Sequence, residues 1–372
     1  MERRELLSKA FSATAGIYFV SCGMGAMAAS HEHPRRKIIV KGKRLLTVDI
    51  HCHCNITELW DLVKDRPESA ELRSIANAPV GKKLDVNNVE FRLQQMDQQG
   101  IDIQAVSGHV GQYYHWADWD LAAQLVKTQN EKIAQLCAAH PDRFVAIGAV
   151  ALQHPALAVK QMEYGIKELD IRGFMITGSV DGMELSDTRL HPFWAKAEEL
   201  GTVIFIHPRS FPAAGDRLAG NGRLDNVIGN PLETTVALSH LIFEGTLDRY
   251  PGVKICAAHG GGYLPSYIGR SDHCVQHDER RCKAIGKLPS QYLKQLYFDS
   301  LVYTKEQLRH LINEVGSDRI VIGTDFPFAM GDYDSVDTIL SVPGLSDSEH
   351  EAILGGTAAR LLGIKQNVLS TA

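Results

Sequence analysis

Residues 45–53 read Leu-Leu-Thr-Val-Asp-Ile-His-Cys-His, and this stretch gives the first indication of the fold. The run from Leu45 to His51 is short and mostly apolar, which is typical of a strand buried on both faces of a parallel sheet. Similar runs follow along the chain at residues 101–107, 143–152, 171–177, 202–207, 253–259, 296–302 and 319–325. Helical patterns lie between or after them at residues 89–99, 121–140, 156–169, 191–200, 234–250, 305–315 and 346–362. Strands and helices in this alternation predict an α/β fold, a (β/α)8 TIM barrel.

The composition of the 372 residues is ordinary for a globular protein, with 44% hydrophobic and 22% charged residues. These values exclude extensive disorder and a coiled coil. The formal net charge of −5 argues against nucleic acid as a partner, because binding to phosphates needs a basic surface. Seven cysteines in a chain of this size do not imply a disulfide framework.

The first 30 residues have a pattern of their own. Arg3 and Arg4 precede an apolar stretch of small residues that ends in Ala26-Met27-Ala28, which predicts a twin-arginine-type signal peptide over residues 1–30. We therefore expect the twin-arginine export machinery as a partner and the periplasm as the location. A frayed N-terminal helix on a cytoplasmic protein is the alternative. Residues 31–44 are interpreted as a basic connector and residues 45–365 as the barrel, with loop insertions at 55–88 and 208–233.

The end of the first strand carries two histidines. Side chains alternate between the faces of a strand, so we expect Asp49, His51 and His53 on one face and Ile50 and Cys52 on the other. Two imidazoles that point into the mouth of a barrel can bind one metal ion. The same alternation turns the cysteine away from the mouth, which argues against a zinc–thiolate site.

Two other strand ends supply further candidate ligands. His207 follows the apolar run at 202–206, and Asp325 ends the run at 319–325. Active sites of such barrels lie at the carboxyl ends of the strands, so these side chains are expected to meet His51 and His53. A buried carboxylate is costly unless a cation relieves it. Three imidazoles and one carboxylate suit Zn²⁺, with Mn²⁺ as the alternative.

His259 ends another strand and is followed by Gly260-Gly261-Gly262. The four ligands already named suffice for a mononuclear site, so His259 is free to move protons as the catalytic acid or base. The glycines are expected to let the backbone pass close to a bound substrate.

Taken together, these motifs resemble the amidohydrolase superfamily, and more narrowly its branch typified by α-amino-β-carboxymuconate-ε-semialdehyde decarboxylase. The resemblance covers roughly residues 45–365 and includes the motif Gly323-Thr324-Asp325-Phe326-Pro327-Phe328. It implies that His51, His53, His207 and Asp325 bind zinc and that His259 is the acid or base. It further implies that Arg270 reaches across the interface of a homodimer to the substrate carboxylate.

Two departures from the branch concern the binding of a carboxylate. An arginine expected after the first strand has no clear counterpart, although Arg66 and Arg73 lie in that region. Arg209 stands where the branch has tryptophan, and its guanidinium could supply the missing positive charge. The alternative for Arg209 is a surface residue on a loop.

Two more carboxylates are candidates for supporting roles. Asp49 could orient one of the ligand imidazoles, or could be a buried polar group of the strand. Asp299, at the end of the run at 296–302, could hydrogen-bond His259 or be structural.

The resemblance favours non-oxidative decarboxylation of an unsaturated or aromatic carboxylic acid. In that reaction a metal-bound hydroxide and His259 would act on the carbon next to the leaving carboxylate. Hydrolysis of an amide or lactone, or a hydration, on the same site is the first alternative. A non-catalytic, exported metal- or ligand-binding protein is the second, and the complete ligand set with His259 argues against it.

Overall fold

We analysed a computed structural model that describes residues 34–69, 79–278, 280, 282 and 284–365. The chain divides into two units, residues 1–33 and 34–372, and all the described residues belong to the second. The predicted signal peptide and Arg73 lie outside the described residues. No helix in the described ranges is both long and apolar enough to span a membrane.

Eight parallel strands form the central sheet, in the order β12-β11-β10-β9-β6-β5-β4-β3. Their bounds are β3 Val48–Cys54, β4 Ile103–Gly108, β5 Phe144–Gly148, β6 Gly173–Ile176, β9 Val203–Ile206, β10 Lys254–Ala257, β11 Tyr297–Asp299 and β12 Ile320–Val321. Isolated bridges between Asp49 and Ile322 and between Cys52 and Phe326 join the first strand to the last segment and close the barrel. The predicted TIM barrel is confirmed.

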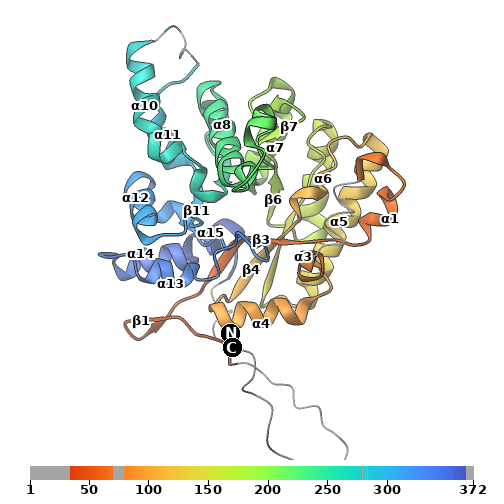
Figure 1. The fold of residues 1–372 in the computed structure, drawn as a ribbon, viewed down its shortest axis with the longest axis horizontal. Coiled ribbons are helices and arrows are strands. Elements are labelled where there is room, and N and C mark those ends of the chain that lie inside the picture. The colour runs from red at the N-terminus through yellow and green to blue at the C-terminus, as the bar shows by residue number, and fades with distance from the viewer. Residues whose placement is uncertain (1–33, 70–78, 279, 281, 283, 366–372) are drawn as a thin grey trace, which may run out of the picture. The chain divides into compact units, whose positions relative to one another are not determined.

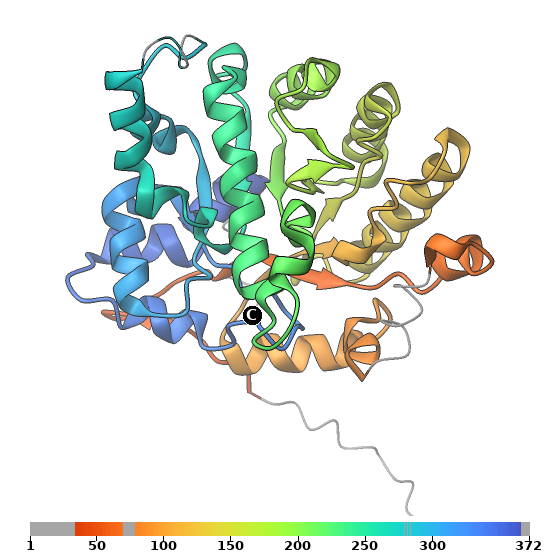
Figure 2. The same ribbon diagram turned by 45° about the horizontal axis from the view of Figure 1, so that its top comes forward.

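Helices surround the strands (Figure 1). Their bounds are α1 Leu59–Val63, α3 Pro79–Leu84, α4 Val89–Gln99, α5 Trp119–Ala139, α6 Pro155–Leu169, α7 His191–Leu200, α8 Asn230–Phe243, α9 Thr246–Arg249, α10 Leu264–His277, α11 Pro289–Tyr292, α12 Lys305–Val315, α13 Ser335–Leu340, α14 Asp347–Glu351 and α15 Thr357–Leu362. Figure 2 shows the longer helices standing side by side around the sheet.

Two apolar clusters hold these layers together. Inside the barrel, Val48, Ile50, Ile103 and Phe205 belong to one cluster of buried side chains. A larger cluster packs the outer faces of the strands against the helices. The strands are therefore buried on both faces, as their apolar sequences predict.

Several predicted boundaries differ from the structure. The predicted helix at 234–250 is divided into α8 and α9 at Gly245, which has a left-handed φ of 73°. The predicted helix at 346–362 contains a π-helical segment at Ala352–Gly356 between α14 and α15. The long helix α10 was not predicted. Two short antiparallel hairpins, β1 (Ile39–Val40) with β2 (Lys43–Arg44) and β7 (Ser179–Val180) with β8 (Met183–Glu184), were also missed.

Candidate metal centre

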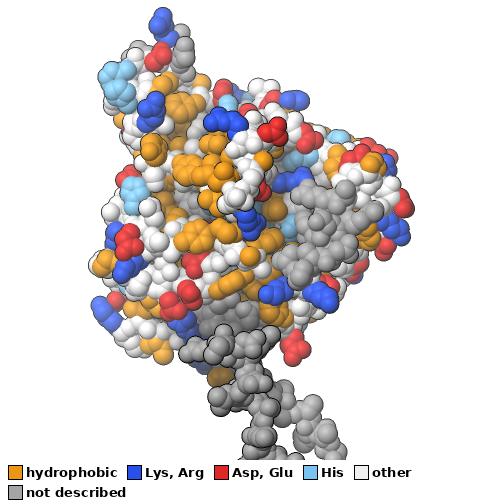
Figure 3. Space-filling view, viewed as in Figure 1, with side chains coloured by type: hydrophobic (Ala, Val, Ile, Leu, Met, Phe, Trp, Pro, Cys, Tyr) orange, Lys and Arg blue, Asp and Glu red, His pale blue; other side chains and the backbone are white. Residues whose placement is uncertain are grey.

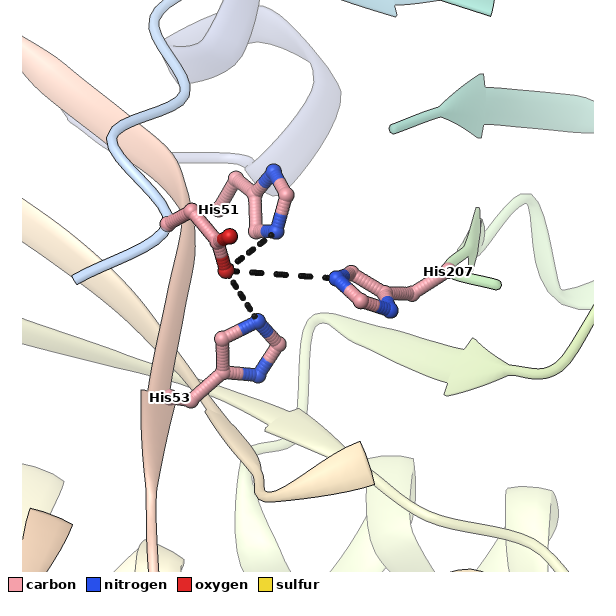
Figure 4. Close-up of side chains that lie close together, drawn as sticks. His51, His53 and His207 are labelled. Atoms are coloured by element: carbon pink, nitrogen blue, oxygen red, sulfur yellow. Dashed lines mark ion pairs between the residues drawn. The ribbon is translucent and has the colours of Figure 1, made fainter. Parts of the chain in front are cut away.

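The four predicted ligands meet at one end of the barrel. His51 and His53 lie on β3, His207 follows β9 directly, and Asp325 lies four residues after the end of β12. The Nε2 atoms of His51, His53 and His207 lie 3.2, 3.1 and 4.0 Å from Oδ1 of Asp325. Figure 4 shows the three imidazoles directed at this carboxylate oxygen. All four ligand atoms lie within 4.8 Å of one another, and all four residues are buried.

The ligand atoms of this cluster have no hydrogen-bond partner within the described part of the protein. Nε2 of each histidine and Oδ1 of Asp325 are buried without a hydrogen-bond partner. The opposite ring nitrogen has an acceptor in each case: Nδ1 of His53 lies 3.2 Å from the carbonyl oxygen of Gly108, and Nδ1 of His207 lies 2.8 Å from that of Pro208. These acceptors place the ring proton on Nδ1 and leave the lone pair of Nε2 free for a cation.

Asp299 orients His51, the third histidine of the cluster. Its Oδ2 lies 2.6 Å from Nδ1 of His51, and both side chains are fully buried. Its Oδ1 accepts hydrogen bonds from the backbone N–H groups of Gly260 and Leu301 at 2.8 and 3.2 Å. The expected alternatives for Asp299 were a hydrogen bond to His259 or a structural role, whereas its observed imidazole partner is His51.

The charges of the site determine where a proton resides without a metal. Burial lowers the pKa of His51, but the carboxylates of Asp325 and Asp299 outweigh this effect and raise it to about 10. Burial, opposed by Asp325, lowers the pKa of His53 and of His207. The pKa of Asp325 lies well below its usual value, because the neighbouring imidazoles outweigh its burial. A cation would thus replace a proton held on His51.

His259 lies beside the four ligands. Its ring centroid is 5.3 Å from that of His51 and 5.2 Å from that of His207. Its Nδ1 is buried without a hydrogen-bond partner. Burial, followed by the charge on His51, lowers the pKa of His259 to about 4, so its imidazole is neutral at pH 7 and can accept a proton.

A β-bulge on β3 changes the predicted arrangement of side chains. The pairing with β4 shifts register between Asp49 and Cys52, and Ile50 belongs to the cluster inside the barrel. Asp49 accepts a hydrogen bond from Nε2 of Gln104 at 3.1 Å. Gln104 lies between two residues of the inner cluster and so points outward. The prediction that Asp49 shares a face with His51 was therefore wrong, because strict alternation ignores the extra residue of a bulge.

From its outward position Asp49 acts on the site through the backbone. Its Oδ1 accepts from the N–H groups of His51 and Thr324, each at 3.1 Å. Its Oδ2 accepts from the hydroxyl of Thr324 at 2.7 Å. Asp49 thus joins the strand that carries two ligands to the residue before Asp325.

Arg92 is a supporting residue that the sequence analysis did not identify. It is 3% exposed on α4. It donates one hydrogen bond to the carbonyl oxygen of His53 and another, of 2.9 Å, to Oε1 of Gln104. Its guanidinium also lies 4.8 Å from the ring centroid of Phe326. The signal in the sequence was an arginine on the otherwise buried side of an amphipathic helix.

The glycines near the site are required by close contacts within the chain. A Cβ on Gly262 would lie 2.1 Å from the carbonyl oxygen of Pro231, and one on Gly323 would lie 2.7 Å from Cβ of Asp299. His259 and Asp325 both have a left-handed φ of 55°. Such backbone conformations are costly and tend to gather at functional sites.

A cavity of about 370 Å³ opens onto two of the ligands, His207 and Asp325, and is also lined by Arg209, Arg223 and Phe328, among others. Arg209, a predicted substrate-binding residue, therefore lies at the wall of this cavity. Arg270 is exposed on α10 and does not line it.

The sequence of the whole barrel identifies its family. A family model described as amidohydrolase matches residues 48–364. This chain belongs to the amidohydrolase family. The resemblance noted from the metal-binding motifs is thereby confirmed.

Relatives of this amidohydrolase include named decarboxylases. The 2-amino-3-carboxymuconate-6-semialdehyde decarboxylase of Dictyostelium discoideum is 30% identical over 338 residues, which cover 87% of this chain and 93% of the relative. The structure of 5-carboxyvanillate decarboxylase LigW from Sphingomonas paucimobilis matches with a TM-score of 0.78 and 24% identity, over 86% of this chain and all of that one. A dihydroxybenzoic acid decarboxylase from Polaromonas sp. JS666, with bound manganese and the inhibitor 2-nitroresorcinol, matches with a TM-score of 0.72 and 25% identity, over 87% and 99% of the two chains.

The donor set, the unsatisfied ligand atoms and the family agree on a divalent metal site formed by His51, His53, His207 and Asp325.

Proposed function

We propose that this protein is a metal-dependent, non-oxidative decarboxylase of an aromatic or unsaturated carboxylic acid. The observation that carries the proposal is His259, whose buried Nδ1 has no hydrogen-bond partner, beside a three-histidine, one-aspartate cluster of which two members line a cavity. Decarboxylases among the relatives, which act on carboxymuconate semialdehyde and on dihydroxybenzoate, support the same reaction class.

We propose zinc as the physiological cation. Zn²⁺ is well matched to imidazole and carboxylate ligands, and Mn²⁺ is the alternative suggested by the manganese in a relative. When bound, either cation supplies a Lewis acid next to the substrate.

The chain itself would bind the acid and move the proton. The guanidinium of Arg209, at the cavity wall, suits bidentate binding of a carboxylate. The neutral imidazole of His259 can take a proton and then deliver it to the substrate carbon that loses carbon dioxide. The half-buried ring of Phe328 lies 5.3 Å from that of His53 and provides an apolar wall for a planar substrate.

We also propose a homodimer in which α10 lies at the interface. Tyr263, Tyr267 and Arg270 are four and three residues apart and so share one side of α10 and of the turn before it. Tyr267 is 71% exposed, and the hydroxyl of Tyr263 donates to the carbonyl oxygen of the exposed Val227 at 3.4 Å. Figure 3 shows apolar side chains gathered on the face of the molecule that Figure 1 presents. An exposed apolar patch of this kind favours a partner, and a second copy would bring Arg270 to its neighbour's cavity.

The location proposed for the protein is the periplasm. The Arg3-Arg4 pair and the apolar stretch after it support export through the twin-arginine machinery. Cell fractionation of the full chain beside a variant with Arg3→Lys and Arg4→Lys tests this location. Equal amounts of both proteins in the periplasm would contradict it.

The reaction is tested on metal-loaded protein with 2,6-dihydroxybenzoate, other hydroxylated benzoates and aminocarboxymuconate semialdehyde. We expect carbon dioxide release, and a loss of about 10²–10⁴-fold in turnover in His259→Ala with the metal content unchanged. His240→Ala, a partly exposed histidine on α8, is the matched control and should behave as wild type. Cleavage of lactones or amides without carbon dioxide release would replace decarboxylation by hydrolysis.

A further inference from the structure

A pair of thiols lies outside the metal centre, where α10 ends. Cys274 occupies the last turn of α10, and Cys282 lies in the segment that leads to α11. Their Sγ atoms are 4.0 Å apart. Cys274 is exposed, whereas Cys282 is 7% exposed. Cys52, Cys54 and Cys256, by contrast, are completely buried in the barrel.

We propose that Cys274 and Cys282 form a disulfide bond when the protein meets an oxidising environment. A disulfide bond is about 2.0 Å long, so the sulfurs must approach by about 2 Å. Cys274 lies in the last turn of α10 and is exposed, so rotation of its side chain can bring its sulfur toward that of Cys282. The cysteines are 282 − 274 = 8 positions apart, so the bond would close a short ring.

The chemistry is thiol–disulfide exchange with an external disulfide, such as oxidised glutathione or an oxidised dithiol protein. The exposed thiolate of Cys274 attacks the external disulfide, forms a mixed disulfide and releases one thiol. Cys282 then attacks the sulfur of Cys274, which releases the second thiol. The two cysteines lose two electrons and two protons, and the external disulfide gains them.

The neighbouring contacts show what such a bond would hold. Oδ1 of Asp272, on α10, accepts a hydrogen bond of 2.9 Å from the N–H of Ser290, on α11. Tyr292, also on α11, donates a hydrogen bond of 2.5 Å to Asp248. Polar contacts thus join α11 to α10 and to α9. A disulfide at Cys274 would add a covalent link four residues after Arg270 and stabilise the helix that carries this arginine.

The bond can be detected directly in the purified full chain. The protein is equilibrated in a mixture of oxidised and reduced glutathione, blocked with an alkylating agent, unfolded and digested with trypsin. Cleavage after Arg270, Arg280, Arg281 and Lys283 would leave peptide 271–280 joined to peptide 282–283. We expect this joined pair, with a loss of two of the seven free thiols, and its disappearance on reduction with dithiothreitol.

Matched variants test the assignment and its consequence. Cys274→Ser and Cys282→Ser should lose the joined pair, whereas Cys137→Ser should keep it. The oxidised wild type should melt roughly 3 °C above the reduced form, a shift absent from Cys274→Ser. Seven free thiols after equilibration, or a bond that involves other cysteines, would overturn the proposal. A joined pair without a thermal shift would overturn the stabilising role. Neither readout depends on carbon dioxide release, so failure of the decarboxylase proposal would leave this test unaffected.

Discussion

Replacement of Asp299 by asparagine is the most direct perturbation of the metal centre that leaves all four ligands in place. The carboxylate serves two groups: Oδ2 faces Nδ1 of His51 at 2.6 Å, and Oδ1 accepts from the N–H groups of Gly260 and Leu301. The single oxygen of an asparagine can accept either from the backbone N–H groups or from Nδ1 of His51, but not from both. If its oxygen stays with the backbone donors, its NH₂ group faces Nδ1 of His51.

That arrangement reverses the tautomer of the ligand. Nδ1 of His51 must then accept the hydrogen bond, and the ring proton moves to Nε2, the atom that faces the other ligands. Loss of a carboxylate that supports a metal ligand typically weakens metal binding by about 10–100-fold, or about 1.4–2.7 kcal/mol. Because Asp299 is fully buried and its hydrogen bond is short, we expect Asp299→Asn to fall in this range.

The assay is a competition titration with a chelator of known affinity, performed with Zn²⁺ and with Mn²⁺ at neutral pH. Asp102→Asn is the control, because Asp102 is also a buried carboxylate but pairs with Arg35 and Arg44 instead of a ligand. It should lose stability without a change in metal affinity. A folded Asp299→Asn protein with wild-type affinity for both metals would refute the tautomer argument.

Three further predictions follow from the same site. The pKa of His51 without metal is about 10, so binding of a cation displaces a proton from this imidazole. The apparent metal affinity should therefore rise with pH, by up to about tenfold per pH unit at pH values below 10. A metal affinity that does not change with pH in the chelator titration would contradict this. Arg92→Met removes the buried donor to the carbonyl oxygen of His53 and should lower the free energy of unfolding by about 2–3 kcal/mol, as measured by urea denaturation. A free energy of unfolding that is unchanged within error would show that this hydrogen bond does not stabilise the fold. Arg270→Ala and His207→Ala proteins, each inactive alone, should regain activity when mixed as dimers, and a mixture that stays inactive would exclude a shared site.

The ligand set could be predicted from the sequence because each ligand lies at the end of a short apolar run that is typical of a buried strand. His207 and Asp325 come from separate strands, yet the topology of a parallel barrel brings their carboxyl ends to one rim. The strand alternation matters only for His51 and His53, which are two residues apart, so errors of a few residues in the strand boundaries did not affect the prediction.

The supporting contacts could not be predicted, because they depend on pairings between distant segments. The partner of Asp299 is on β3, and only closure of the barrel brings β11 within reach of that strand. The outward turn of Asp49 depends on a bulge that leaves no mark in the alternation of residue types. Helix α10 was missed because its sequence contains Pro265 and Gly269, which are the poorest helix formers.

The bridges that link β3 to the segment directly after β12 have a consequence for the order of assembly. Two ligands come from the first barrel strand and one from beyond the last, so the cation sits at the seam where the sheet closes on itself. A nascent polypeptide that lacks its final segment has no such seam and cannot hold the ion with all four groups. Capture of the ion by all four groups therefore requires that synthesis has passed Asp325 and that the barrel has closed, and truncation before Asp325 should weaken metal binding even when the earlier strands have formed.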